Sequence, residues 1–284
     1  MVKRSLLLTT TLAMIAFAGN SVLCRLALGA SGGIDAASFT TIRLASGALM
    51  LALLVLWSRS KITVRSAGDW PSAFALFAYA VCFSFAYRGL QAGTGALLLF
   101  GAVQVSMIGW GLWRGERLAL VQWMGLTLAA AGLGGLLLPG LSAPPWASAV
   151  LMLLAGVAWG VYSIRGRGAG DPLQVTAGNF LRACAFAALS SLAAVTQVHL
   201  DAAGVAFATL SGALTSGVGY AIWYTALRRL SGTVAAGVQL SVPPIAALAG
   251  VLWLGEPLSS RLVVASAVIL GGIALVIRGR LTRS

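Results

Sequence analysis

Long apolar runs alternate with short polar connections along the whole chain. Ten of these runs are about as long as the roughly 20 residues that a helix needs to cross a bilayer. They cover residues 5–27, 36–57, 71–88, 93–113, 119–138, 145–164, 173–197, 203–226, 233–253 and 260–277. Because the connections are short, no soluble domain is left over. The pattern predicts an all-α polytopic membrane protein with ten transmembrane helices.

Parts of this pattern repeat at a distance of about half the chain. A Leu-Trp-x-Gly-Glu stretch ends the fourth run at residues 112–116 and returns at the end of the ninth run at residues 252–256. Residues 16–21 of the first run resemble residues 158–163 of the sixth. An internal repeat of this length indicates a duplicated structural unit.

The repeat predicts two halves of five helices each, residues 1–142 and residues 143–284. Since five is odd, the second half must cross the membrane upside down relative to the first. Inverted repeats around a site near the bilayer midplane are typical of alternating-access transporters.

Composition agrees with a membrane protein. Of the 284 residues, 59% are apolar and 9% are charged, whereas soluble proteins carry roughly 25% charged residues. The three cysteines, Cys24, Cys82 and Cys184, are odd in number and lie inside apolar runs, so we expect no disulfide framework.

The net charge of +13 is interpreted as a topology signal and not as a nucleic-acid-binding surface, because the basic residues form short clusters between apolar spans. If the N-terminus is cytoplasmic, fourteen of the nineteen Lys and Arg residues fall on the cytoplasmic side. These are Lys3, Arg4, Arg59, Lys61, Arg65, Arg114, Arg117, Arg165, Arg167, Arg228, Arg229, Arg278, Arg280 and Arg283. We expect a multi-pass protein of a bacterial inner membrane with both termini in the cytoplasm. A cleavable signal peptide is the alternative for the first run, but its removal would leave nine spans and break the repeat.

The ten spans, the inverted five-plus-five repeat, the Gly-Glu-x-Leu bends and the short loops resemble the drug/metabolite transporter superfamily, and within it the EamA-type ten-helix exporters. The aromatic residues of spans one, three, six and eight make the chain most similar to the YddG-type exporters of aromatic amino acids. The resemblance implies export, a central cavity walled by spans one to four and six to nine, and peripheral positions for spans five and ten.

The six acidic residues are predicted in loops or at span ends. They are Asp35, Asp69, Glu116, Asp171, Asp201 and Glu256. Proton-coupled transporters usually place a carboxylate inside the membrane, so we expect facilitated diffusion or exchange. We expect Glu116 and Glu256 to cap or tie the bends beside Arg114 and Arg117, or Arg261, and a role as a gate latch is the alternative.

Arg43 and Arg182 are predicted inside spans two and seven. A buried arginine in a membrane costs roughly 2.5 kcal/mol or more unless it is partnered or reaches water. The two are candidates for holding a substrate carboxylate through paired N–H donors. The alternative is that each guanidinium satisfies backbone carbonyls at a broken helix.

Other side chains inside the spans are candidates for a substrate site, because polar groups in hydrocarbon must face the protein interior or a wet cavity. The polar candidates are Asn20, Gln104, Ser163, Asn179 and Gln239, and the aromatic candidates are Phe17, Tyr79, Phe83, Trp159, Tyr162 and Tyr220. Ordinary helix packing is the alternative for each. Pro243 and Pro244 should bend the ninth span and act as a hinge. An aromatic cavity with a few amides and hydroxyls suits neutral or zwitterionic amphiphiles.

We therefore expect a secondary transporter that needs no cofactor or metal and exports small amphiphilic metabolites, with aromatic amino acids as the first candidates. It would act in the lipid bilayer as a monomer, or as a homodimer through small-residue faces of spans five and ten. Alternatives are a multidrug or other metabolite exporter of the same fold, then a channel, then an intramembrane serine hydrolase. The last rests on Ser31 in a Gly-x-Ser-x-Gly match together with His199.

Overall fold

The computed structural model describes residues 2–29, 33–58, 67–140, 143–166, 170–230 and 232–281. Eight spans are single helices: α1 (Val2–Leu28), α2 (Ala36–Trp57), α3 (Trp70–Ala86), α4 (Ala92–Trp113), α5 (Leu120–Leu137), α6 (Trp146–Arg165), α7 (Pro172–Ala193) and α12 (Ser260–Leu281). The eighth span joins α8 (Ala202–Leu210), the π-helical segment η2 (Ser211–Val218) and α9 (Gly219–Leu227). The ninth span joins α10 (Gly232–Gln239) and α11 (Val242–Leu254).

These elements confirm the prediction of an all-α protein with ten membrane spans. Within the described residues, nine stretches are long and apolar enough to cross a bilayer, and α3 is an apolar helix of 17 residues. The tenth span, α12, continues past its predicted end at residue 277, and the seventh span stops short of its predicted end at residue 197. The α-helix of the seventh span ends at Ala193 and continues as a single 3₁₀ turn, η1 (Val195–Gln197), before α8 begins.

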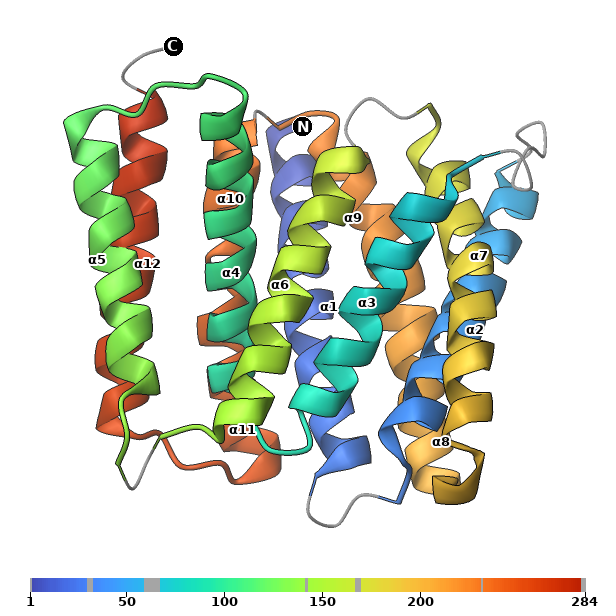
Figure 1. Ribbon diagram of the computed structural model, residues 1–284. Helices are drawn as coiled ribbons and strands as arrows, with labels where there is room; N and C mark the ends of the chain where they lie inside the picture. Colours follow the sequence, from blue (N-terminus) through green and yellow to red (C-terminus); the bar gives the residue numbers. More distant parts are fainter. Residues whose placement is uncertain are drawn as a thin grey trace.

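The helices alternate in direction, and both termini lie at the same end of the bundle (Figure 1). We call this the termini end and the opposite end the far end. The bend between α4 and α5 lies at the termini end, whereas the bend between α11 and α12 lies at the far end (Figure 1). The two Gly-Glu bends thus occupy opposite ends, as an inverted repeat requires.

Only some of the basic residues predicted to be cytoplasmic lie within the described residues. Arg59, Lys61, Arg65, Arg167 and Arg283 lie outside the described residues, as do the side chains of Lys3, Arg4 and Arg280. The others belong to the termini end, at the last turns of α4, α6, α9 and α12 or directly after them. Ser31 of the serine hydrolase alternative also lies outside the described residues.

Four of the six acidic residues lie at helix starts for a physical reason. Asp35, Asp69, Asp171 and Asp201 are the N-caps of α2, α3, α7 and α8, and each side chain accepts backbone N–H groups of the first turn. The first N–H groups of a helix have no partner inside the helix, and a capping carboxylate satisfies them. These acids therefore define where spans begin.

Helices α5 and α12 form a pair at one edge of the bundle (Figure 1). Their backbones approach closely, because a Cβ added at Gly125 would lie 2.4 Å from the carbonyl oxygen of Gly272. Gly132 of α5 is in similarly close contact with Ile269 of α12. Small residues permit this kind of packing in membranes. Gly125, Gly132 and Gly272 are thus used for packing inside one chain, whereas Gly134, Gly135 and Gly271 have no neighbour within 4 Å of an added Cβ.

Two spans are irregular near the middle of the bundle. In the ninth, Leu240 and Ser241 form a turn between α10 and α11, and Pro243 and Pro244 lie in the first turn of α11. The bend predicted from the prolines is present, because proline lacks the N–H that a continuous helix needs. In the eighth, the π-helical segment η2 was not foreseen. Such segments are frequent at functional sites.

Candidate functional site

An aromatic cluster occupies the centre of the bundle. Phe17, Tyr79, Phe83, Trp159 and Tyr220, all predicted as site residues, line one small cavity. The other lining residues are Asn20, Leu99, Phe100 and Thr215. We call this set of residues the central cage. Its cavity of about 20 Å³ has room for about one water molecule, so the cage is closed in this conformation.

Trp159 lies at the middle of the cage. Its ring centroid is 5.0 Å from that of Tyr79, 5.0 Å from that of Tyr220 and 6.3 Å from that of Phe17. These are distances at which aromatic rings attract one another. The rings come from α1, α3, α6 and α9, so both halves of the chain contribute.

Arg43 lies behind two walls of the cage. Its side chain is 1% exposed, and its guanidinium carbon is 5.2 Å from the ring centroid of Tyr79 and 4.9 Å from that of Phe83. Nη2 donates to the Tyr79 hydroxyl over 2.9 Å, and Nε donates to the Ser216 hydroxyl over 3.2 Å. Neither partner carries a negative charge.

The charge of Arg43 is therefore not neutralised by the chain. All six acidic residues are described, and none of them forms an ion pair with Arg43. Nη1 is buried without a hydrogen-bond partner among the described residues. An unpaired buried charge is expensive, and proteins keep one where it has a role. The N–H groups of Nη1 are therefore left with hydrogen-bonding capacity that the described residues do not use.

Asn20 connects the cage to the eighth span. Its amide nitrogen donates to Tyr79 Oη over 3.3 Å, and its oxygen accepts from Ser211 Oγ over 2.6 Å and from Thr215 Oγ1 over 3.3 Å. Ser211 and Thr215 belong to the π-helical segment η2. Asn20, Tyr79 and Arg43 thus form one polar network against the aromatic rings.

A second cavity lies between the cage and the termini end. It has a volume of about 270 Å³, and three predicted polar residues, Gln104, Ser163 and Gln239, line it. The remaining lining residues are Met107, Trp223, Tyr224, Leu227, Leu230, Ala235 and Ala236. We call this cavity the vestibule. Trp223 separates it from the cage, since its ring centroid is 5.9 Å from that of Phe17.

Besides Arg43, three predicted residues line neither cavity. Tyr162 is buried beside the cage, with its ring centroid 5.5 Å from that of Trp159. Asn179 Oδ1 accepts the backbone N–H of Asp69 over 3.0 Å. Arg182 donates from Nη1 to the carbonyl oxygens of Ala67 and Gly178 over 2.7 and 3.0 Å.

The two arginines predicted inside spans therefore have different kinds of partner. Arg182 adopts the alternative arrangement, in which a guanidinium satisfies backbone carbonyls. Arg43 is held by hydroxyl groups and keeps one nitrogen free. Only Arg43 is adjacent to the cage.

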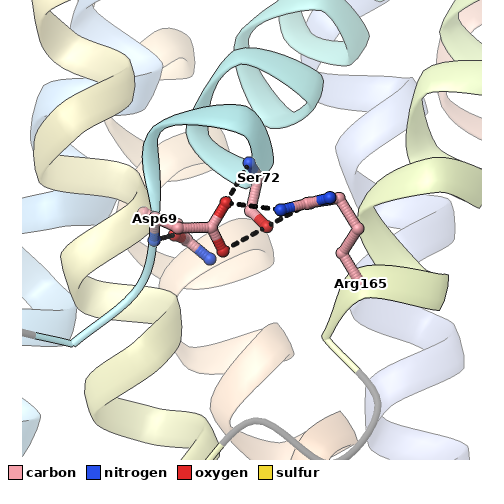
Figure 2. Close-up of polar contacts among 4 residues, drawn as sticks. Asp69, Ser72 and Arg165 are labelled. Carbon is pink, nitrogen blue, oxygen red and sulfur yellow. Dashed lines mark hydrogen bonds and ion pairs between the residues drawn. The ribbon is translucent and has the colours of Figure 1, made fainter.

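Ion pairs tie the two halves together at both ends of the bundle. At the termini end, Arg165 of α6 donates to Asp69 over 2.9 Å and to Ser72 over 3.0 Å, both at the start of α3 (Figure 2). At the far end, Arg25 of α1 pairs with Glu256 of the α11–α12 bend over 2.9 Å. Partial burial acts to raise the pKa of Asp69, but hydrogen bonds from Ser72 and Arg165 outweigh it and lower the pKa below its ordinary value.

The expected partner of Glu256 was wrong. We expected Arg261, which is close in sequence, but Arg261 donates to the carbonyl oxygen of Leu138. Arg25, more than 200 residues away, takes its place. Sequence proximity favours short-range pairing, whereas the inverted packing brings α1 next to α11.

Several site residues were not predicted from the sequence. Leu99, Phe100, Thr215 and Trp223 line the two cavities, and Ser211 and Ser216 hold Asn20 and Arg43. One signal was available, because Ser211, Thr215 and Ser216 are spaced so as to share one helical face inside an apolar span. Leu99 and Phe100 of α4 have no such spacing that would have marked them as site residues.

Comparison with known proteins agrees with this architecture. Residues 146–278 match the model of the EamA-like transporter family. An uncharacterized protein of Pseudomonas aeruginosa is 59% identical over 99% of this chain and 97% of its own length. A probable terminal-alkyne amino-acid exporter of Streptantibioticus cattleyicolor is 29% identical over 88% of this chain and 86% of its own length.

The fold is also known from crystallography. A protein of known crystal structure superposes with a TM-score of 0.70 over 96% of this chain and 97% of its own, at 18% identity. At that identity the match shows the fold alone. The inverted ten-helix bundle, the central cage and these relatives all agree with one assignment. The chain belongs to the EamA-like transporter family.

Proposed function

We propose that this protein exports small amphiphilic carboxylates with a free amino group across a bacterial inner membrane, with aromatic amino acids as the first candidates. The observation that carries the proposal is the buried Arg43, which has a free Nη1 and lies against the aromatic cage. The distant relative named as an amino-acid exporter supports the same class of substrate.

The chemistry of the cage fits such a molecule. A carboxylate hydrogen-bonded to Nη1 of Arg43 would neutralise a charge that the chain leaves unpaired, and charge-assisted bonds are about twice as strong as neutral ones. The rings of Trp159, Tyr79 and Tyr220 would pack against an apolar side chain and can attract an ammonium group through their faces. Phosphorylated substrates fit poorly, because the cage offers a single cation.

Substrate binding requires the cage to expand, since its cavity of about 20 Å³ is far smaller than an amino acid. The vestibule of about 270 Å³ approaches the size of ligand pockets, which begin near 300 Å³. In our proposal the substrate enters the vestibule from the cytoplasm and passes Trp223 and Phe17 to reach the cage. The break before Pro243 and Pro244 allows α10 and α11 to move separately.

We propose that the termini end faces the cytoplasm, and the distribution of charges supports this orientation. Placing the termini end in the cytoplasm puts Arg114, Arg165, Arg228 and Arg278 on the side where basic residues accumulate. Asp35 and Asp69 are helix caps outside the membrane-spanning segments. We therefore propose facilitated diffusion or exchange, because no described acidic residue lies within a span as a proton carrier.

Counterflow in proteoliposomes tests this function. Vesicles preloaded with unlabelled phenylalanine should accumulate external labelled phenylalanine transiently, at a rate that saturates, without an imposed ion gradient. Phenylpropionate and phenylethylamine are matched competitors, since each lacks one charged group. We expect phenylpropionate to compete and phenylethylamine to compete far less.

Two results would overturn the proposal. Counterflow of cationic drugs or nucleosides with none for any amino acid would make the protein a multidrug or other metabolite exporter of the same fold. Flux that never saturates and shows no counterflow would identify a channel. A strict requirement for a proton gradient would refute only the part of the proposal that concerns coupling.

A further inference from the structure

We propose that the ion pair between Arg25 and Glu256 is a latch that keeps the far end closed and must break each time substrate leaves on that side. The inference rests on the proposed transport cycle. It concerns a residue pair that lines neither the cage nor the vestibule, and it does not depend on which substrate is carried.

Four segments of the chain meet at this pair. Arg25 donates from Nε to Glu256 Oε1 over 2.9 Å and from Nη1 to the carbonyl oxygen of Tyr87 over 3.0 Å. Glu256 Oε2 accepts the backbone N–H of Ala92 over 2.8 Å. One carboxylate and one guanidinium thus join the end of α1, the end of α3, the start of α4 and the α11–α12 bend.

The two ends of the bundle differ in how closely α4 approaches the ninth span. At the far end, a Cβ added at Gly93 of α4 would lie 2.6 Å from the Cβ of Ala247 in α11, so these helices are in tight contact. At the termini end the vestibule lies between α4 and α10, and a bond of 3.4 Å joins Gln104 to the carbonyl oxygen of Ala236. The latch therefore lies at the end that is closed in this conformation.

A third cavity lies at the far end, beside the contact between Gly93 and Ala247. It shares no lining residue with the cage. It has a volume of about 290 Å³ and is lined by the loops around Leu90, Pro144 and Pro257 and by the end of α5. The closed path from the cage to the far end instead follows α1. Phe17, Asn20 and Cys24 are spaced to share one face of this helix, and Arg25 follows directly.

The ion pair at the termini end is of a different kind. The side chains of Arg165 and Asp69 are 43% and 47% exposed, whereas those of Arg25 and Glu256 are 20% and 10% exposed. Water weakens exposed pairs, and losing one partner of a buried pair leaves the other charge uncompensated. Both pairs connect one half of the chain to the other. We infer that the buried pair controls the closed end, and the exposed pair serves as the matched control.

Cys24 provides a reporter on the closed path. Its side chain is fully buried and lies within electrostatic reach of both Arg43 and Arg25. It is thus between the cage and the latch. A membrane-impermeant thiol reagent added on the far side can reach it only when the far end opens.

The experiment uses full-length protein in proteoliposomes, with Cys82→Ser and Cys184→Ser so that Cys24 is the only thiol. Glu256→Gln removes the charge of the latch but keeps an oxygen to accept the N–H of Ala92. We expect an impermeant methanethiosulfonate on the far side to modify Cys24 about tenfold faster than in the parent, because a partly buried pair has lost one charge. Asp69→Asn, at the termini end, should not increase this rate.

Arg25→Gln is a second, independent variant and should increase the rate in the same way, so the test survives if one variant fails to fold. Unchanged labelling in a folded Glu256→Gln or Arg25→Gln protein would overturn the latch. Equal increases in these variants and in Asp69→Asn would also overturn it, because they would indicate general loosening. The labelling requires no substrate, so failure of amino acids to exchange would refute the proposed function and leave this result standing.

Discussion

The guanidinium of Arg43 donates a hydrogen bond to the hydroxyl of Tyr79 over 2.9 Å in the middle of the bundle. Tyr79 also accepts from Asn20, and Asn20 in turn accepts from the eighth span. A cation on α2 is thus positioned by hydroxyl and amide groups of other helices, none of which neutralises it. This arrangement holds the guanidinium of Arg43 in place and leaves Nη1 without a partner among the described residues.

Replacing Arg43 by lysine tests this relationship. Arg43→Lys keeps the charge but loses the planar set of donors that can hold Tyr79 and Ser216 and still offer Nη1. Because a hydrogen bond to a charged group contributes about 1.5–3 kcal/mol, we expect the KM for phenylalanine counterflow to rise about tenfold or more. Arg182→Lys is the control, since Arg182 bonds to backbone carbonyls away from the cage. Equal KM values for Arg43→Lys and the parent would remove Arg43 from carboxylate recognition.

The prolines of the ninth span lead to a kinetic prediction. In a variant with both Pro243→Ala and Pro244→Ala, α10 and α11 can join through the turn at Leu240 and Ser241, because alanine restores the missing N–H groups. A straighter and stiffer span should lower the maximal counterflow rate and leave the KM nearly unchanged, since neither proline lines the cage. Pro172→Ala, in the first turn of α7, is the control. A large change in KM with an unchanged maximal rate would mean that the prolines shape the site and do not act as a hinge.

Much of the fold could be predicted because its physical cause is local in the sequence. The hydrocarbon core demands runs of about 20 apolar residues, and the acidic caps and Gly-Glu bends mark where the runs end. The predicted boundaries of most spans agree with the helices within a few residues. The seventh span was predicted too long, because the α-helix ends at Ala193 and residues 195–197 form a 3₁₀ turn.

The site was harder to predict, because its causes are non-local. Polar residues inside spans were recognised, but their spacing does not say which meet in one place. Asn20 belongs to the cage, Gln104 and Gln239 to the vestibule, and Asn179 to the start of α3. The pairing of Arg25 with Glu256 depends on how two halves pack, and the π-helical turn at Ser211 depends on its fit against α2. Neither the ion pair nor the π-helical turn can be recognised from a single stretch of the sequence.

The close contact of α5 and α12 predicts a site where size alone determines stability. In Gly125→Val, the new side chain would meet the backbone of Gly272 at 2.4 Å, so the helices must separate. Overpacking of this kind costs about 1–3 kcal/mol. We expect a clear fall in the melting temperature of the purified protein in detergent. Gly134→Ala is the matched control on the same helix, because nothing lies within 4 Å of its added Cβ, and it should be neutral or slightly stabilising. Equal melting temperatures for Gly125→Val and the parent would contradict the backbone contact.

The ion pair of Asp69 with Arg165 predicts how stability depends on pH at the termini end. Burial raises the pKa of Asp69, but hydrogen bonds from Ser72 and Arg165 lower it overall, below the ordinary value of 3.8. A carboxyl group whose pKa is lowered by folding stabilises the protein fully above its unfolded pKa, and this contribution is lost as the pH falls through the folded pKa. The contribution should therefore be constant at neutral pH and vanish only in acid.

Asp69→Asn isolates that contribution, since asparagine can still cap α3 but carries no charge for Arg165. The pair is about half exposed, so it contributes at most about 1 kcal/mol, which corresponds to a melting temperature about 2–4 °C lower for the variant near neutral pH. The difference should be constant near neutral pH, shrink as the pH falls below the ordinary carboxyl pKa of 3.8, and disappear only below the lowered pKa of the folded state, where the parent carboxyl is neutral too. Melting curves in detergent over this range measure it. A difference that is the same at both extremes would show that the charge of Asp69 contributes nothing and that its substitution acts through packing.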